Sequence, residues 1–253
     1  MPAQLTPKTD TPLVELFSSI QGEGILVGKR QIFIRFPGCN LSCSYCDTDF
    51  SSPDSCRAEE APGSGIFRSL ANPVSLEVLS SILANWVHLL PGVHHSISLT
   101  GGEPLLHTDV LRQWLPVLRE ICPLFLETNG TLPGHLEPLL PYLEWVSMDV
   151  KLASMTGADT PWSLHRDFLS LMAHHNGQVK AVVGEETPTE EILQAARLVE
   201  ECAPDLPLIL QPRTEGGRIS LTGRMLLDMQ ARASAIHSDV RIIPQTHRFI
   251  SVL

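Results

Sequence analysis

The 253-residue sequence lacks a long apolar run, an excess of positive charge and an apolar amino-terminal segment. No run approaches the ~18 apolar residues that a membrane-spanning helix needs, and residues 1–10 do not resemble a secretion signal. Lys and Arg number 18 against 28 Asp and Glu, and the net charge of −10 argues against a broad basic surface for nucleic acid or anionic lipid. We therefore expect a cytoplasmic protein without a membrane or nucleic-acid partner.

What the sequence does contain is an alternation of β-rich and helical segments, with 43% hydrophobic and 18% charged residues in a length that fits one domain over residues 1–253. Short apolar runs predict strands at Gln31–Phe36, Ser96–Thr100, Leu124–Thr128, Trp145–Asp149, Val179–Val183, Pro207–Gln211 and Val240–Ile243. Apolar residues spaced by three and four predict helices at Ser75–Leu90, Thr108–Ile121, Leu164–His174, Thr189–Cys202 and Leu221–Ala235. The fold class is therefore α/β, and the length fits an open, partial (β/α)6-type barrel better than a complete eightfold one.

Residues 49–72 interrupt this alternation. The segment is rich in Ser, Pro, Gly and mixed charges and shows little periodicity. We expect a long loop here, either a functional lid or a disordered connection.

Polar side chains gather where the predicted strands end. In a strand successive side chains alternate between faces, so Arg35 would point into the barrel, opposite Ile34 and Phe36. Ligands of such folds lie at the carboxyl ends of the strands. The candidate rim comprises Thr100–Glu103, Glu127–Asn129, Asp149–Lys151 and Gln211–Arg213.

Three of the six cysteines, Cys39, Cys43 and Cys46, fall within eight residues. Such clustering in a cytosolic chain indicates metal or redox chemistry sooner than disulfides. A structural zinc site usually has four ligands, and no second cysteine pair or nearby histidine completes one. A [4Fe–4S] cluster held by three thiolates would leave one iron open, and we favour it over zinc. The other cysteines, Cys56, Cys122 and Cys202, are expected to be ordinary thiols.

The C-x3-C-x2-C spacing, followed by Gly-Gly-Glu-Pro at the end of the next strand, resembles the radical S-adenosylmethionine (SAM) superfamily. Further blocks resemble one family within it, the 7-carboxy-7-deazaguanine synthases. They are Ser19–Gly24, Phe33–Leu41, Cys46–Thr48, Leu99–Leu106, Leu126–Thr131, Asp149–Lys151, Leu210–Pro212 and Pro244–His247. The triad alone is specific only to the superfamily, whereas these ordered blocks indicate the narrower family.

The resemblance implies conversion of 6-carboxy-5,6,7,8-tetrahydropterin into 7-carboxy-7-deazaguanine, a radical ring contraction with loss of ammonia on the route to queuosine and other 7-deazapurines. It implies a [4Fe–4S] cluster and SAM as cofactors, with Mg²⁺ also taking part. By resemblance, Cys39, Cys43 and Cys46 hold the cluster, Thr48 offers a hydroxyl to Mg²⁺, and no side chain is assigned as a catalytic acid or base.

The resemblance also divides the remaining candidate residues between two ligands. The substrate would be bound by Ile20, Gln21, Gly22, Arg35, Thr100, Gln245, His247 and Leu253, with Arg35 pairing with its carboxylate. SAM would be surrounded by Gly102, Glu103, Glu127, Asn129, Asp149, Val150, Lys151, Gln211, Pro212, Arg213 and Thr214. Structural roles stay open for three residues: an internal ion pair for Arg35, a helix cap for Glu127 and a local turn for Thr48.

Two rival functions share part of this pattern. A glycyl-radical-enzyme activase has the same cysteine loop, and a non-catalytic zinc or iron–sulfur module would need no SAM site. The resemblance further implies a reducing partner such as flavodoxin or ferredoxin, a small-molecule pterin substrate and a homodimer.

Overall fold

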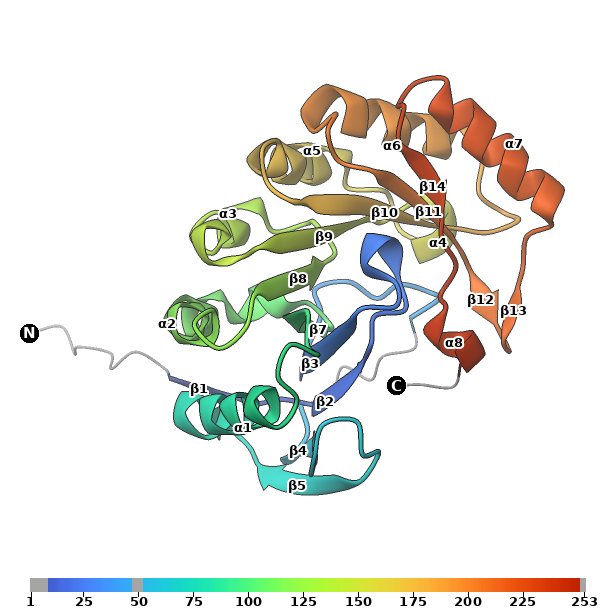
Figure 1. Ribbon diagram of the computed structural model, residues 1–253. Coiled ribbons are helices and arrows are strands. Elements are labelled where there is room, and N and C mark those ends of the chain that lie inside the picture. Colours follow the sequence, from blue (N-terminus) through green and yellow to red (C-terminus); the bar gives the residue numbers. More distant parts are fainter. Residues whose placement is uncertain (1–8, 47–51, 251–253) are drawn as a thin grey trace, which may run out of the picture.

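The computed structural model describes residues 9–46 and 52–250 (Figure 1). Its centre is a ten-stranded sheet in the order β14-β11-β10-β9-β8-β7-β3-β2-β4-β5, which curves without closing on itself. The strands are β2 (Glu15–Ile20), β3 (Arg30–Phe36), β4 (Ser55–Glu59), β5 (Phe67–Ala71), β7 (Ser96–Gly101), β8 (Leu124–Thr128), β9 (Trp145–Val150), β10 (Gly177–Val183), β11 (Leu208–Pro212) and β14 (Val240–Ile242). Two short pairs lie outside it: β1 (Asp10–Thr11) with β6 (Val74–Ser75), and β12 (Thr214–Glu215) with β13 (Arg218–Ile219).

Parallel pairing joins β3, β7, β8, β9, β10, β11 and β14, and a helix lies in each of the six connections between them. These helices are α1 (Leu76–Leu89), α2 (Thr108–Leu118), α3 (Pro133–Leu136), α5 (Trp162–Met172), α6 (Thr189–Cys202) and α7 (Gly223–Ser234), all on the outer side of the sheet in Figure 1. Parallel neighbours need such crossover connections. The expected open barrel of six strand–helix units is confirmed.

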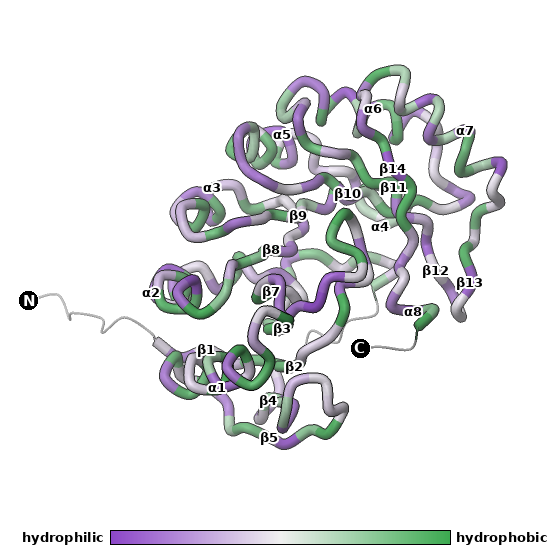
Figure 2. Tube along the Cα trace, in the orientation of Figure 1, coloured by the Kyte–Doolittle hydropathy of each residue, from purple (hydrophilic) through white to green (hydrophobic). Residues whose placement is uncertain are grey.

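Local sequence explains where these helices begin and which face they bury. The Ser75 hydroxyl accepts from the backbone N–H of Val78 at the start of α1, and α6 opens with Glu190 and Glu191. Each helix carries both hydrophobic and hydrophilic residues (Figure 2), as expected for a helix that packs one face against the sheet and exposes the other. The remaining helical pieces are α4 (Ala153–Thr156), α8 (His247–Ile250) and the 3₁₀ turns η1 (Gly24–Leu26), η2 (Pro104–His107) and η3 (Leu140–Tyr142).

The expectation of a long loop over residues 49–72 is wrong for most of its length. β4 and β5 form an antiparallel hairpin that extends the sheet beyond β2. Cys56 and Ala58 point into the core, while β5 is an edge strand in which no residue is fully buried, so its sequence lacks the apolar alternation of a half-buried strand. The guanidinium of Arg57 lies 3.9 Å from the ring centre of Phe67 and links the two strands. Residues 49–51 of the segment lie outside the described residues.

Strand alternation around β3 follows the sequence pattern. Ile32, Ile34 and Phe36 are fully buried between sheet and helices, whereas Phe33 and Arg35 face the inner side. Strand β2, which pairs antiparallel with β3, was not among the expected strands. Among the described residues, no helix has the length and apolarity to cross a membrane.

Candidate active site

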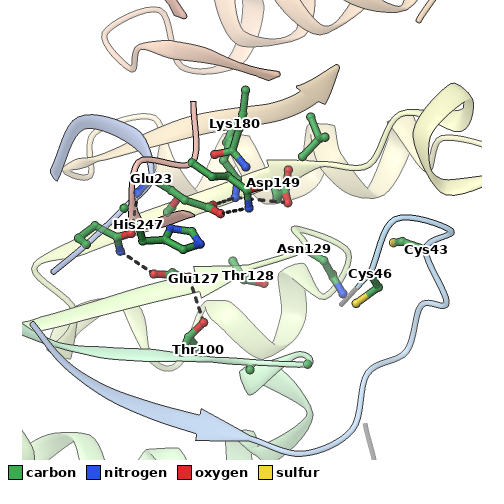
Figure 3. Close-up of a pocket in the computed structure, with 18 of the residues that line it drawn as sticks. Glu23, Cys43, Cys46, Thr100, Glu127, Thr128, Asn129, Asp149, Lys180 and His247 are labelled. Carbon is green, nitrogen blue, oxygen red and sulfur yellow. Dashed lines mark hydrogen bonds and ion pairs between the residues drawn. The ribbon is translucent and has the colours of Figure 1, made fainter. Parts of the chain in front are cut away.

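A cavity of about 320 Å³ opens at the carboxyl ends of the parallel strands, and its size is in the usual range for a small-molecule site. It is lined by the loop after β2, the cysteine loop after β3, the ends of β7 to β11, and Gln245, His247 and Arg248. In Figure 3 the cavity has two ends: Cys43, Cys46 and Asn129 lie at one, and Glu23, Lys180 and His247 lie at the other. Most residues of the rim expected from the sequence therefore lie in the cavity wall.

All three clustered cysteines line the cavity. The Cys39 sulfur accepts from the backbone N–H of Leu41 at 3.4 Å and faces the Asn129 side-chain amide at 3.8 Å. Burial raises the pKa of the Cys39 and Cys43 thiols. Among residues 9–46 and 52–250, no three His, Cys, Asp or Glu side chains converge closely enough to hold a single metal ion. The soft thiolate donors fit an iron–sulfur cluster, whose ligands bind different irons.

Two glycines at the end of β7 bring that strand against the cysteine loop. Gly101 has φ +128°, and a Cβ at Gly102 would lie 1.8 Å from the carbonyl oxygen of Gly38. In addition, the N–H of Gly102 donates to Phe36 O at 3.1 Å and that of Glu103 donates to Gly38 O at 2.8 Å. Only a residue without a side chain permits this approach.

Glu103 does not take the position expected for a residue that surrounds SAM. Its side chain is fully buried and does not line the cavity. One oxygen accepts from the Leu105 N–H at 3.0 Å and the Thr128 hydroxyl at 2.8 Å, and the other accepts from the Asn129 N–H at 2.7 Å. Burial raises the pKa of Glu103, although these hydrogen bonds oppose the shift. The carboxyl group instead ties the end of β7 to the end of β8.

Val150 and Pro212 also do not line the cavity, since both side chains are buried in the strands that carry their neighbours. The other expected SAM residues in the described part of the chain do line it: Gly102, Glu127, Asn129, Asp149, Lys151, Gln211, Arg213 and Thr214. So do Ile20, Gln21, Gly22, Arg35, Thr100, Gln245 and His247 from the substrate set. Thr48 and Leu253 lie outside the described residues.

Three buried oxygen atoms in the cavity wall have no hydrogen-bond partner in the described structure. They are Asp149 Oδ1, Gln211 Oε1 and Thr214 Oγ1, from β9, β11 and β12, whereas the buried Arg213 Nε is ion-paired with Glu215 at 2.9 Å. An unpaired buried polar group is costly, so such atoms indicate a missing ligand. SAM offers an ammonium, hydroxyls and an adenine amino group to satisfy them, and the wall therefore fits SAM chemically.

A chain of charged groups crosses the cavity. Lys151 Nζ lies 2.6 Å from Asp149 and 3.0 Å from the Tyr45 hydroxyl, and Lys180 contacts both Glu23 and Asp149. Burial disfavours the Glu23 carboxylate, but the Lys180 ammonium outweighs it and holds the pKa of Glu23 at about 2. The pKa of Lys151 is raised well above its usual value, because the charge of Asp149 overcomes the effect of burial. The site therefore holds both ammonium groups charged.

Glu127 collects hydrogen bonds on the inner face of the sheet. Its carboxylate accepts from Gln21 Nε2 at 2.8 Å, Ser98 Oγ at 3.1 Å and Thr100 Oγ1 at 3.0 Å. The helix-cap role left open for Glu127 is wrong, since α3 starts only at Pro133. Glu127 instead lies beside residues expected to bind the substrate.

Arg35 forms the internal ion pair that its sequence left open and also faces the cavity. It lines the cavity with 27% of its side chain exposed, and its Nε lies 3.3 Å from Glu15, which also pairs with Arg57. Glu15 is shared between two guanidinium groups and pairs with Arg35 only through Nε. The other guanidinium nitrogens of Arg35 are therefore available to a ligand carboxylate.

Sequence reasoning missed several wall residues. Glu23 and Lys180 are the most informative, and Gln178 fixes η1 by accepting from the Ile25 N–H at 2.6 Å. A signal was present: Gln178, Lys180 and Val182 alternate along β10 and so had to face the same side as the cavity. Glu23 lies within the Gln-Gly-Glu-Gly block, but nothing in the block shows its partner.

The comparisons with known proteins agree with this geometry. The model of the radical SAM superfamily matches residues 33–200, so the chain belongs to that superfamily. QueE from Escherichia coli has the same fold, with a TM-score of 0.60 at 21% identity over 94% of this chain and 95% of that one.

Within the superfamily, the chain belongs to the 7-carboxy-7-deazaguanine synthases, radical SAM enzymes of 7-deazapurine biosynthesis. A curated synthase from Geobacter sulfurreducens is 46% identical over 248 residues, covering 97% of this chain and 99% of the relative. One from Methanothermobacter thermautotrophicus is 36% identical over 95% of this chain and 97% of the relative. The family membership favours neither an activase nor a non-catalytic module.

Proposed function

We propose that the protein converts 6-carboxy-5,6,7,8-tetrahydropterin into 7-carboxy-7-deazaguanine and ammonia. The observation that supports it is the two-ended cavity, with cluster-type thiols at one end, Glu23, Lys180 and His247 at the other, and a polar pocket of Gln21, Arg35, Thr100 and Glu127 in its wall. A radical source at one end and a recognition surface at the other is the arrangement that a ring contraction on a bound pterin requires.

The cofactors supply the radical chemistry. The [4Fe–4S] cluster would be held by Cys39, Cys43 and Cys46, and when reduced it would cleave SAM to give the 5′-deoxyadenosyl radical that takes a hydrogen atom from the pterin. Asp149, Gln211 and Thr214 would bind SAM through their unpaired polar atoms.

The polar pocket would bind and orient the pterin. Arg35 grips the substrate carboxylate through the guanidinium edge that Glu15 leaves available. Glu127 and Gln21 face the ring, where the Glu127 carboxylate accepts from ring N–H groups. The two N–H groups of Gln21 are used by Gln31 and Glu127, so its Oε1 serves as an acceptor. His247 and Gln245 close the far side. Holding the ring in one orientation toward the radical source lowers the entropic cost of bringing the reacting atoms together.

Further partners complete the proposal. Mg²⁺, held in part by the Thr48 hydroxyl, would bind the substrate carboxylate, because Mg²⁺ prefers oxygen ligands. A flavodoxin or ferredoxin would reduce the cluster, and the protein would work in the cytoplasm as a homodimer. Reaction rates with and without a chelator, with each reductant, and sedimentation of the reconstituted protein test these points separately.

The experiment that tests the activity is anaerobic reconstitution with iron and sulfide, followed by SAM, reductant, Mg²⁺ and carboxytetrahydropterin. We expect the deazaguanine and ammonia in equal amounts, with SAM recovered, and none of either product from Cys43→Ala. If 5′-deoxyadenosine forms while the pterin is untouched, the substrate is wrong although the radical chemistry stands. Stoichiometric zinc without iron–sulfur absorbance would exclude the radical chemistry itself.

A further inference from the structure

A fully buried histidine interrupts the apolar inner face of α5. His165, Phe168, Leu169 and Met172 fall at spacings of three, four and seven residues and are all completely inaccessible to solvent. These positions form the helix stripe that packs on the sheet, where an apolar residue is the rule. A polar side chain here needs hydrogen-bond partners, and His165 has two.

Both ring nitrogens of His165 bond to backbone groups. Its Nε2 lies 3.1 Å from the backbone nitrogen of Lys151, and its Nδ1 lies 3.1 Å from the carbonyl oxygen of Gly130. A backbone N–H only donates, so Nε2 accepts, and Nδ1 must carry the proton that it donates to Gly130. The imidazole is therefore neutral, in one tautomer, with both nitrogens used.

The two bonds join the ends of neighbouring strands at the cavity. Gly130 follows Asn129, whose side chain contacts Cys39 and Asn40, and Lys151 is the residue that pairs with Asp149. The packing at Gly130 is tight: its φ is +67°, and a Cβ there would lie 3.2 Å from His165 Nδ1. His165 thus holds the β8 and β9 ends in register from behind the cavity wall, without lining the cavity itself.

We propose that His165 is a positioning residue that sets the β8 and β9 ends, and with them Asn129 and Lys151, in the geometry that binds SAM. The inference rests on the proposed function, because it takes SAM as the ligand between these two ends. Packing of α5 on the sheet would not by itself require either of these hydrogen bonds. An apolar ring of similar size would fill the space but leave the Lys151 N–H and the Gly130 carbonyl unpaired.

The test compares His165→Phe with His165→Gln in the anaerobically reconstituted protein. Phe keeps the volume and removes both bonds, whereas Gln keeps one acceptor and one donor on a flexible chain. SAM affinity is measured from the change that SAM causes in the EPR spectrum of the reduced cluster, and KM for SAM and kcat are measured separately. We expect His165→Phe to weaken SAM binding by about tenfold or more with cluster content retained, and His165→Gln to recover most of that loss.

His237→Phe is the matched control. His237 is also fully buried and also uses both nitrogens, on Glu200 and the Leu206 carbonyl, but it lies outside the cavity wall. We expect this variant to lose stability while SAM affinity stays at the wild-type value.

The outcomes separate the positioning role from the proposed function. If the wild-type protein shows no SAM-induced spectral change, the proposed function fails. If it does, and His165→Phe binds SAM as tightly as the wild type, or weakens it no more than His237→Phe does, the positioning role is wrong. Should His165→Phe not fold, His165→Leu, which also removes both hydrogen bonds, takes its place, and wild-type SAM affinity in that variant would likewise refute the positioning role.

Discussion

Replacing Gly102 by alanine tests the contact between the end of β7 and the cysteine loop. The new Cβ would lie 1.8 Å from Gly38 O and 2.5 Å from Gly38 C, whereas ordinary contact starts at 3.4 Å. The two backbones must therefore separate by about 1.6 Å, and both clashing atoms belong to main chain that cannot rotate away. A displacement of that size next to Cys39 moves a cluster ligand, and misplacement by ~1 Å can cost about 100-fold in rate.

The assay is iron and sulfide content after anaerobic reconstitution, followed by SAM cleavage. We expect Gly102→Ala to unfold with a free energy lower by about 1–3 kcal/mol and to lose most SAM cleavage. Gly134→Ala is the control, since a Cβ there meets nothing within 4 Å and the residue has no positive φ. A Gly102→Ala protein with wild-type cluster content and wild-type turnover would show that the close approach is not needed.

Three further predictions address other parts of the molecule. Glu23→Gln should lower the free energy of unfolding by about 3 kcal/mol in urea titrations, because it leaves Lys180 with only the more distant Asp149 as a buried carboxylate partner, whereas Arg232→Gln in an exposed pair should change it little; equal effects would contradict the argument. Burial lowers the pKa of His165 to about 4, so the folded state binds fewer protons than the unfolded state between pH 6.5 and about 4. Stability should therefore fall by about 3 kcal/mol as the pH drops through that window, and the same titration of His165→Phe should be flatter; parallel curves would place the titration elsewhere. Cys122→Ala and Cys202→Ala should retain the full iron and sulfide content that Cys43→Ala loses, and iron loss from either would make it a ligand.

The fold was largely readable from the sequence because its periodic signals are strong. All seven parallel strands and five of the six helices over them were expected, since buried parallel strands are short apolar runs and the helices carry one apolar stripe. The hairpin of β4 and β5 was missed because β5 is an exposed edge strand without apolar alternation. Strand β2 was missed because only its last two residues, Ser19 and Ile20, were considered, as the start of a motif. Pairing partners of an edge strand are set by tertiary contacts, which leave little trace in local sequence.

The candidate site was likewise only partly predictable from the sequence. Positions at strand ends could be placed on one rim, because parallel strands bring their carboxyl ends together. What each side chain does there could not be deduced: Glu103 turned into the protein to join two strands, and Glu127 collects three side-chain donors. The partner of each side chain depends on contacts between residues that are far apart in the sequence, as in the ion pair of Glu23 and Lys180.

The wall that closes the far side of the cavity has a consequence for how the protein matures. Glu23 accepts from Gln245 at 2.7 Å and the Gly22 carbonyl accepts from the Thr246 N–H at 2.8 Å, contacts that span 222 and 224 residues. Loop closure of this length comes late in folding, after the local strand–helix units have formed. During synthesis, the strands that carry the cysteine loop therefore emerge and pair long before the substrate pocket is complete. Cluster insertion can precede the closing of that wall, and the order of assembly would then run from the iron–sulfur end of the cavity to the pterin end.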